Sequence, residues 1–365
     1  MIDFAARLFP GWRVKLKARR GRVVLSALIL LLVLVVVVSA DKGAVEINPR
    51  QIVAILSERI GVHLPVAFTA LQASTLIDIR LPRIVLVLLV GAALGVSGAA
   101  MQGLFRNPLA DPALIGISSG AALAATAVVI IGDAVALSLP IVFQLFAFPV
   151  AAFAGALLTT LIVYRLATIG GQTIVSTLLL AGIAINALAT AFSGFLTFYA
   201  TDTQIRSLTF WKLGSLGGGN WTNVFVAAPF ILLPVLIFPT LARPLNALLL
   251  GESEAGHLGF DIERVKKLTV VLVALAVGAS VAFTGLISFV GLVVPHLLRL
   301  VVGPDHRVLL PGSALLGASL LLIADLIART LVAPAEMPIG ILTAITGAPF
   351  FLWLLLRDRQ WRVAL

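Results

Sequence analysis

The chain contains no cysteine and very little charge. With no cysteine among 365 residues, disulfide bonds, thiolate metal sites and cysteine nucleophiles are all excluded. Only 12% of the residues are charged, whereas about 25% is usual in soluble domains. Apolar residues make up 60% of the chain. These proportions exclude an ordinary soluble domain and predict an integral membrane protein.

The sequence also lacks any loop that could hold a nucleotide. No lysine follows a glycine, so the Gly-Lys-Ser/Thr phosphate loop is absent. The chain is therefore not expected to be an enzyme: it has no predicted catalytic residue or cofactor, and any ATP must be hydrolysed by another chain.

An ion-driven carrier would be expected to place acidic groups or histidines in mid-span, but Asp325 and His296 both lie near span ends. A secondary transporter driven by an ion gradient remains the rival class.

Long runs that are apolar on every side predict helices and an all-α membrane protein, because the strands of a membrane barrel alternate in polarity. The block Leu268–Val302 would be roughly 52 Å of helix, against a hydrocarbon core of about 30 Å, so we expect it to fold back at Thr284-Gly285. The ten predicted spans cover residues 23–40, 82–105, 113–132, 140–164, 173–199, 221–242, 268–284, 286–302, 308–329 and 338–356.

The basic residues are spread among loops beside the spans, which favours a role in topology over nucleic-acid binding. A basic segment before an apolar run resembles a signal peptide, but no convincing small-residue cleavage site follows Ala40. We therefore predict a basic cytoplasmic tail over 1–22, a ten-span domain over 23–356 and a basic cytoplasmic tail over 357–365. Residues 41–79 are predicted to form an external loop that includes an amphipathic piece.

Two segments share the pattern Gly-Ala-x4-Ser/Thr-Gly, namely Gly91–Gly98 and Gly278–Gly285. The predicted topology runs their spans in opposite directions, and inverted repeats are typical of transporters. Small residues are common in membrane helices for packing reasons alone, so the match on its own is weak support for an inverted internal repeat.

A polar elbow, Asn107-Pro108-Leu109, interrupts two apolar runs. Irregular backbone at a membrane boundary persists only where protein or a water-filled cavity shelters it, so the elbow is a candidate gate; an ordinary turn is the alternative.

The segment 243–267 is the longest hydrophilic insertion on the predicted inner side. Its helix-turn-helix pattern could dock in a groove of a cytosolic partner, or it could be a solvated loop.

Eight motifs in one order resemble the permease family of bacterial ABC importers for haem, iron-siderophores and cobalamin, the FecCD-type family. The resemblance extends over nearly all of residues 80–357, and is strongest to a haem importer permease. The motifs are RLPR, GAALGVSGAAMQGLFRNPLADPALIGISSGAA, LLLAGIAI, FWKLGSLGGGNW, GESEAGHLGF, FTGLISFVGLVVPHLLRLVVGPDHRVLLPGSALLGA, ADLIAR and EMPIGILTAITGAPFFLWLL.

This resemblance implies the type II permease fold of ABC importers in the bacterial inner membrane. It implies a homodimer of ten-span subunits with the path at the dimer interface, two cytosolic ATP-binding subunits that bind ATP and Mg, and a periplasmic substrate-binding protein. Membrane lipid surrounds such a subunit, and no nucleic acid is expected. Residues 245–259 would be the segment that couples to the ATPase, through Glu252, Leu258 and Gly259.

The resemblance also assigns roles to arginines and to gate residues. Binding-protein docking is expected at Arg80, Arg83 and Arg329, with interfacial snorkelling as the alternative; Asp325, four residues before Arg329, could pair with it. The cytoplasmic gate is expected at Asn107, Leu109 and, in the loop that enters the fifth span, Ser176.

The substrate path is expected at Tyr199, Arg206 and Trp211, on or beside a short helix within 201–220. Haem is the favoured cargo because Arg206 could meet a propionate; ferric siderophore and cobalamin are the alternatives. The four histidines show no metal-ligand spacing, and no metal site is predicted.

Overall fold

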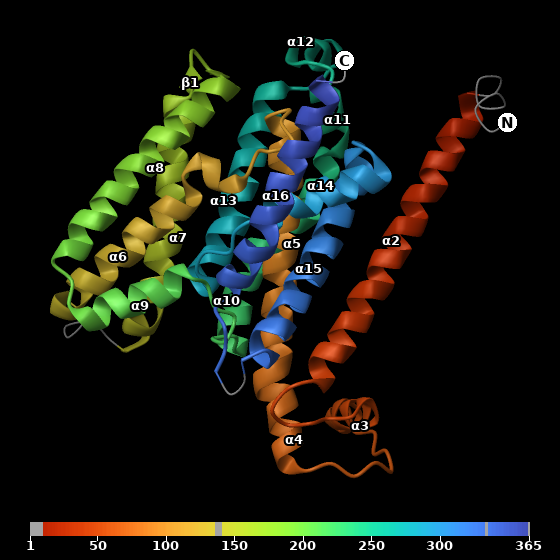
Figure 1. The fold of residues 1–365 in the computed structure, drawn as a ribbon, viewed down its shortest axis with the longest axis vertical. Helices are drawn as coiled ribbons and strands as arrows, with labels where there is room; N and C mark the ends of the chain where they lie inside the picture. Colours follow the sequence, from red (N-terminus) through yellow and green to blue (C-terminus); the bar gives the residue numbers. More distant parts are fainter. Residues whose placement is uncertain (1–9, 136–140, 333–334, 364–365) are drawn as a thin grey trace.

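The computed structural model describes residues 10–135, 141–332 and 335–363. In this part of the chain almost every element is helical (Figure 1). The first half contains α2 (Pro10–Asp41), α3 (Pro49–Arg59), α4 (Ala70–Ser74), η1 (Thr75–Arg80), α5 (Leu81–Leu104), η2 (Pro112–Ile115), α6 (Ile117–Val135), α7 (Ile141–Leu166), β1 (Thr168–Ile169), β2 (Gln172–Thr173) and α8 (Val175–Phe198). The second half contains α9 (Asp202–Lys212), α10 (Trp221–Ile237), η4 (Phe238–Leu241), α11 (Ala242–Leu248), α12 (Glu252–His257), α13 (Ile262–Thr284), α14 (Val290–Val302), α15 (His306–Thr330) and α16 (Ile339–Val363).

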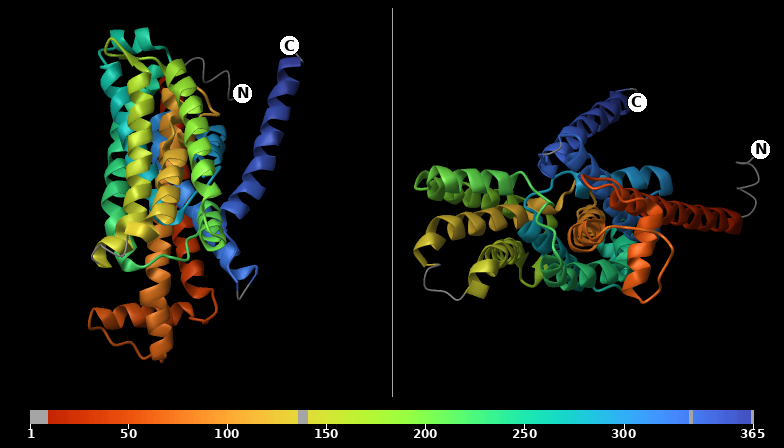
Figure 2. Two further views of the ribbon diagram at one scale, coloured as in Figure 1. Left: turned by 90° about the vertical axis from the view of Figure 1, so that its left-hand side faces the viewer. Right: turned by 90° about the horizontal axis from the view of Figure 1, so that it is seen from below.

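Helix α5 lies at the centre of the molecule. Seen end on, it is surrounded by other helices (Figure 2, right), and 83% of its most apolar window is buried. It continues α4 and η1 without a break, so the helical rod Ala70–Leu104 has 35 residues and extends past the bundle beside α3 (Figure 1). We call the end that carries α3 and α4 the α3 end, and the opposite end, which carries α12, the α12 end.

Glycines allow α5 to approach its neighbours at backbone distance. A Cβ added at Gly91 would lie 2.5 Å from the carbonyl oxygen of Gly317 in α15, and one at Gly98 would lie 1.7 Å from that of Gly291 in α14. Small residues are the usual means of such close helix contact in membranes. The Gly-Ala-x4-Ser/Thr-Gly segment of α5 is therefore explained by helix packing, and the repeat it suggested stays a proposal.

Replacing Gly98 by alanine is expected to destabilise the bundle by at least about 1–3 kcal/mol, the usual cost of overpacking, because the obstructing atom belongs to rigid backbone. Gly194→Ala in α8 is the matched control, since a Cβ there meets nothing within 4 Å and glycine weakens a helix interior. Thermal unfolding of the purified chain in detergent should show a lower midpoint for Gly98→Ala alone. Equal midpoints would contradict the packing argument.

Each predicted span corresponds to a helix, but the helices differ in length. Seven are long and apolar enough to cross a membrane, as judged by length and composition, and three shorter apolar helices cover Ile117–Gly132, Val290–Val302 and Ile339–Trp353. All of these lie in the described part of the chain. An all-helical, multi-span chain is therefore confirmed, whereas the count of ten crossings stays a proposal.

Several boundaries differ from those predicted. The bend at Thr284-Gly285 is confirmed, since α13 ends there and Gly285 has φ 71°. Helix α13 begins at Ile262, earlier than predicted, because the Asp261 side chain accepts a hydrogen bond from the Arg264 N–H and caps its first turn. The described parts of both predicted tails are helical, because α2 begins at Pro10 and α16 continues to Val363. Residues 1–9 and 364–365 lie outside the described residues.

A two-stranded hairpin before α8 was not predicted. Thr168 pairs with Thr173 and Ile169 with Gln172, and Gly170-Gly171 forms the turn with φ 59° and 82°. Two consecutive positive φ angles favour Gly-Gly, so this dipeptide was the available signal. The hairpin matters because it lies against α13 and leads directly into α8.

Candidate functional site

The elbow after α5 is held by its own side chain. The Leu109 N–H donates to the Asn107 side-chain oxygen at 2.9 Å, and the Asn107 N–H donates to the Gln102 carbonyl at 3.2 Å. Arg106, immediately before, has φ 49°, a conformation that L residues seldom adopt. Asn107 is exposed and Leu109 half-buried, so the predicted gate residues form a structured turn at the α12 end.

Asp111 follows the elbow and points inward. Its carboxylate accepts a hydrogen bond from the Ala113 N–H at 2.8 Å and lines a cavity of about 360 Å³ beside Ser118, Ser288 and Gly291. Burial raises the pKa of Asp111 above its ordinary value, and the hydrogen bond from Ala113 opposes this change. The sequence analysis did not single out this residue.

The predicted coupling segment is a helix-turn-helix. Helices α11 and α12 meet at Gly251, whose φ of 133° only glycine adopts without strain. Leu258 ends α12 with 61% of its surface exposed, and Gly259, with φ 85°, turns the chain towards α13. An exposed leucine at the C-terminal end of α12 is available for contact with a partner, and the docking interpretation stays a prediction.

A buried lysine connects this hairpin to the rest of the α12 end. The Lys266 side chain in α13 is 3% exposed, and its Nζ lies 2.7 Å from a Glu252 carboxylate oxygen and 2.9 Å from one of Glu263. It also donates to the Thr173 carbonyl in β2 at 2.7 Å. Glu263 in turn accepts from the Thr173 N–H at 2.8 Å. We call these four residues the Lys266 cluster; it joins α12, α13 and the hairpin.

One cavity brings parts of the predicted coupling segment and the predicted gate together. It measures about 700 Å³ and is lined by Phe105 and Arg106 beside the elbow, by Ser176, and by Glu252 and Lys266. Ser176 is the second residue of α8, not part of a loop as predicted, because the hairpin occupies the preceding residues. Asn107 and Leu109 are not among the lining residues. Of the three predicted gate residues, the structure therefore places only Ser176 in this cavity.

The predicted docking arginines lie together at the α3 end, but their side chains are engaged within the chain. Arg83 contacts Asp325 at 2.8 Å and Glu336 at 2.7 Å. Asp325 is 1% exposed and also lies 3.8 Å from Arg329, four residues later. The predicted Asp325–Arg329 pair is confirmed, and Arg83 is the closer partner of the same carboxylate. This buried group fixes α5 against α15.

The other two arginines hold the turn that leads from α2 towards α3. Arg80 is 5% exposed and donates to the carbonyls of Ala40, Asp41 and Val45. Arg329 donates to the carbonyl of Lys42 at 2.8 Å and to that of Ser39. These bonds satisfy carbonyls at a helix end. The docking role of the three arginines stays a prediction, since their charges are already paired or hydrogen-bonded here.

The predicted path residues surround α9. Tyr199 is 66% exposed and its ring lies 5.4 Å from that of Phe195. Arg206 is exposed on α9. Trp211 instead turns inward: its ring centroid lies 5.3 Å from that of Phe148 of α7, in an edge-to-face arrangement. The structure therefore brings Tyr199 and Arg206 to the surface and gives Trp211 a packing contact.

A polar groove between α6 and α8 was missed by sequence reasoning. It encloses about 630 Å³. Ser119 donates to Asn186 at 2.5 Å, and Asn186 donates to the Ala113 carbonyl at 3.2 Å. The side chains of its polar lining belong to Ser118, Ser119, Asn186, Thr190, Ser193, Thr197 and Lys212. The spacing of Asn186, Thr190, Ser193 and Thr197 on one helical face was the available signal.

Comparisons with known proteins agree with this architecture. The FecCD transport family matches residues 30–357. The hemin transport system permease protein HmuU of Yersinia pestis is 46% identical over 341 residues, which cover 93% of this chain and 97% of that protein. The cobalamin import system permease protein BtuC of Halobacterium salinarum is 48% identical over 284 residues, which cover 78% of this chain and 73% of that protein.

A solved structure shows the same arrangement of helices. It is an inward-facing conformation provisionally assigned as a metal-chelate type ABC transporter, and it is 33% identical with a TM-score of 0.79. The match covers 91% of this chain and 98% of the solved one. The fold and the order of the elements described above are therefore shared along almost the whole length of both chains.

Proposed function

Because this chain belongs to the FecCD transport family, we propose that it is the membrane permease of an ATP-driven importer that carries haem inward. The observation that carries the cargo assignment is the extent of the similarity: it covers 93% of the chain for the hemin permease and 78% for the cobalamin permease. Ferric siderophore and cobalamin are the second candidates. The described fold contains no nucleotide-binding loop, so ATP and Mg would be held by partner subunits.

The α12 end is proposed to face the cytoplasm and to receive two ATPase subunits. The exposed Leu258 at the C-terminal end of α12 would enter a groove of the ATPase, with Glu252 and Gly259 on the same hairpin segment. Full burial of a leucine side chain in such a groove would contribute about 1.5–3 kcal/mol. In this orientation both termini are cytoplasmic and the α3 end faces the binding protein.

A second copy of the chain is proposed to pack against α8. Only 17% of the apolar window of α8 is buried, and its outward face is rich in large side chains. Among the most exposed are Leu180, Ile183, Phe192, Phe195 and Phe198. A path at this dimer interface would have Tyr199 and Arg206 at its outer mouth and Asn107, Leu109 and Ser176 at its inner gate. Trp211 would support the mouth from behind.

The docking proposal for the arginines takes a specific form. Glu336 is half exposed and holds Arg83 on the outer side, whereas Asp325 holds it from within. An acidic residue of a binding protein would replace Glu336 while the Arg83–Asp325 pair stays intact. Such partly exposed charge pairs affect orientation and association rate more than affinity. Arg80 and Arg329 would shape the docking surface through the α2–α3 turn that they hold.

Uptake into vesicles tests the cargo. The permease, reconstituted with its ATPase and binding protein, should accumulate haem in preference to a ferrichrome-like siderophore and cobalamin. Preference for either of the other cargoes would refute the haem assignment and retain the importer. Uptake that follows an imposed ion gradient without ATP would support the ion-coupled rival class instead.

Arg206→Ala should reduce haem uptake about tenfold while basal ATP hydrolysis stays within a factor of two, because a charge-assisted bond to a propionate contributes roughly 1.5–3 kcal/mol. Arg206→Lys should recover only part of the uptake, since an ammonium lacks the bidentate fork that suits a carboxylate. Tyr199→Phe serves as a control at the same mouth that keeps the charge. Equal loss of uptake and hydrolysis would mark Arg206 as structural.

A further inference from the structure

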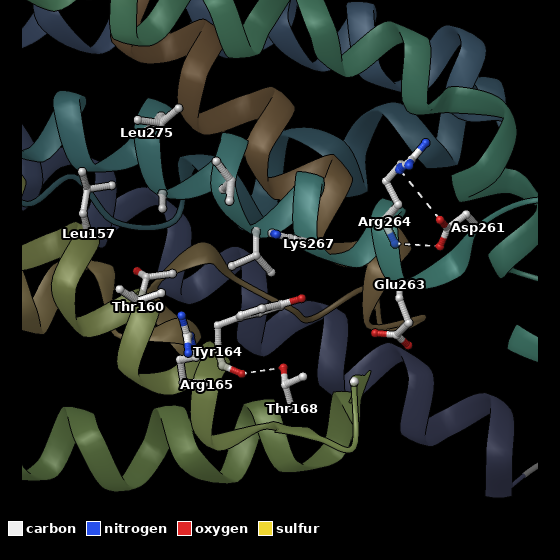
Figure 3. A pocket seen from close by; sticks show the side chains of 15 residues that line it. Leu157, Thr160, Tyr164, Arg165, Thr168, Asp261, Glu263, Arg264, Lys267 and Leu275 are labelled. Atoms are coloured by element: carbon white, nitrogen blue, oxygen red, sulfur yellow. Dashed lines mark hydrogen bonds and ion pairs between the residues drawn. The ribbon is translucent and has the colours of Figure 1, made fainter.

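A cavity of about 850 Å³ lies between α7 and α13 at the α12 end, outside the proposed path (Figure 3). One wall comes from α7 and the other from α13, and the turn of the β1–β2 hairpin closes the end. Its lining residues are Leu157, Thr160, Leu161, Tyr164, Arg165, Thr168, Gly171, Asp261, Glu263, Arg264, Lys267, Val270, Val271, Ala274 and Leu275.

The two ends of this cavity differ sharply in chemistry. Towards mid-membrane the walls are mainly apolar, with Leu157 and Leu161 on α7 and Val271 and Leu275 on α13. Leu161 is 50% exposed and Val271 45% exposed, so the groove opens outward at span depth. Towards the α12 end the lining becomes basic. Figure 3 shows Arg165 extending from α7 and Lys267 from α13 into the space between the two helices.

The acidic residues in the lining are already engaged, whereas two of its three basic residues, Arg165 and Lys267, are not neutralised. Glu263 pairs with Lys266 at 2.9 Å, and Asp261 caps α13 and lies 3.7 Å from Arg264. Within the described part of the chain, neither Arg165 nor Lys267 has an acidic partner within 4.0 Å. The groove therefore presents two cations above an apolar slot.

We infer that this groove binds one anionic phospholipid, with its phosphate between Arg165 and Lys267 and its acyl chains along the α7 and α13 walls. Basic pockets between membrane helices on the cytoplasmic side are suited to such headgroups, and the apolar walls require acyl chains that a free phosphate lacks. The inference goes beyond the proposed transport function. It rests on the chain spanning a membrane and not on the identity of its cargo.

The site also lies next to the Lys266 cluster. Glu263 lines the groove on one side and accepts from Lys266 on the other, and Gly171 of the hairpin closes the groove. A lipid headgroup held by Arg165 and Lys267 would therefore bridge α7 to α13 directly beside the elements that connect the coupling hairpin to α8. A bound lipid should therefore hold the β1–β2 hairpin more firmly against α13.

Native mass spectrometry of the detergent-purified full chain, titrated with phosphatidylglycerol and separately with phosphatidylcholine, tests the inference. The unmodified chain should bind one phosphatidylglycerol more tightly than any phosphatidylcholine. Arg165→Gln with Lys267→Gln should weaken that binding about 30-fold, because each basic residue near an anionic headgroup contributes roughly a factor of five. The matched control, Arg22→Gln with Arg307→Gln, removes two cations of the same membrane face outside the groove and should leave the tight site intact.

Two outcomes would overturn the inference. Equal binding of phosphatidylglycerol by the double variant and its control would show that the two cations do not form the site. Displacement of the lipid by millimolar inorganic phosphate would show that the groove recognises a phosphate alone. Thermal unfolding of each variant is measured in parallel as a check on folding. Leu161→Asn tests the acyl-chain wall separately, since it should weaken lipid binding without altering the charge.

Discussion

Arg83→Gln is expected to destabilise the folded chain by about 3–5 kcal/mol, the usual cost of removing one partner from a buried ion pair. The reason is that Asp325, with only 1% of its surface exposed, would keep its charge and lose its closest counter-ion. Arg329 lies 3.8 Å away and could compensate only in part. Unfolding of the purified chain in mixed micelles, followed over a denaturant series, gives the change directly.

The double variant Arg83→Gln with Asp325→Asn should recover most of this stability, because both charges of the pair are then gone. Arg50→Gln on α3 is the matched control, since this exposed arginine lies at the same end of the molecule. If the single variant were as stable as the control, Arg83 would be free to act mainly in docking. The folded double variant then allows the association rate with a binding protein to be measured separately from stability.

Replacement of Lys266 by methionine is expected to lower cargo-stimulated transport about tenfold while ATP hydrolysis by the assembled complex continues. Mutations of residues that lie between two coupled sites change their coupling by about 0.5–2 kcal/mol, and Lys266 connects Glu252 of the proposed coupling hairpin to Thr173 ahead of α8. Without it, movement of the hairpin would no longer be transmitted to Ser176. Uptake and hydrolysis are measured on the same vesicles.

The acidic side of the cluster provides the complementary test. Glu252→Gln with Glu263→Gln leaves a lysine that is 3% exposed without a counter-ion, so this pair of changes should destabilise the chain more than Lys266→Met does. Arg307→Met, a loss of a basic residue on the same membrane face, is the control and should leave the ratio of uptake to hydrolysis unchanged. If Lys266→Met behaves like this control, the cluster is structural and not part of energy coupling.

The sequence by itself determined the class of protein and the positions of its helices. Lipid cannot hydrogen-bond free peptide groups, so apolar runs of span length must be helical, and each of the ten predicted spans does coincide with a helix. The bend at Thr284-Gly285 followed from length alone, because one uninterrupted helix would have exceeded the membrane. The coupling hairpin was predictable as a helix-turn-helix from its local pattern of apolar and polar residues.

Only the tertiary structure decided which charged groups neutralise one another. Arg83 and Asp325 are 242 positions apart in the chain, and Lys266 and Thr173 are 93 apart. Such distant residues meet only after the helices have packed, and helix packing depends on side-chain shape and on glycine contacts such as Gly98 with Gly291. The predicted topology therefore placed Arg80, Arg83 and Arg329 at one end of the bundle. Topology could not show that Arg80 and Arg83 hold the fold together, or that Arg165 and Lys267 line opposite walls of one groove.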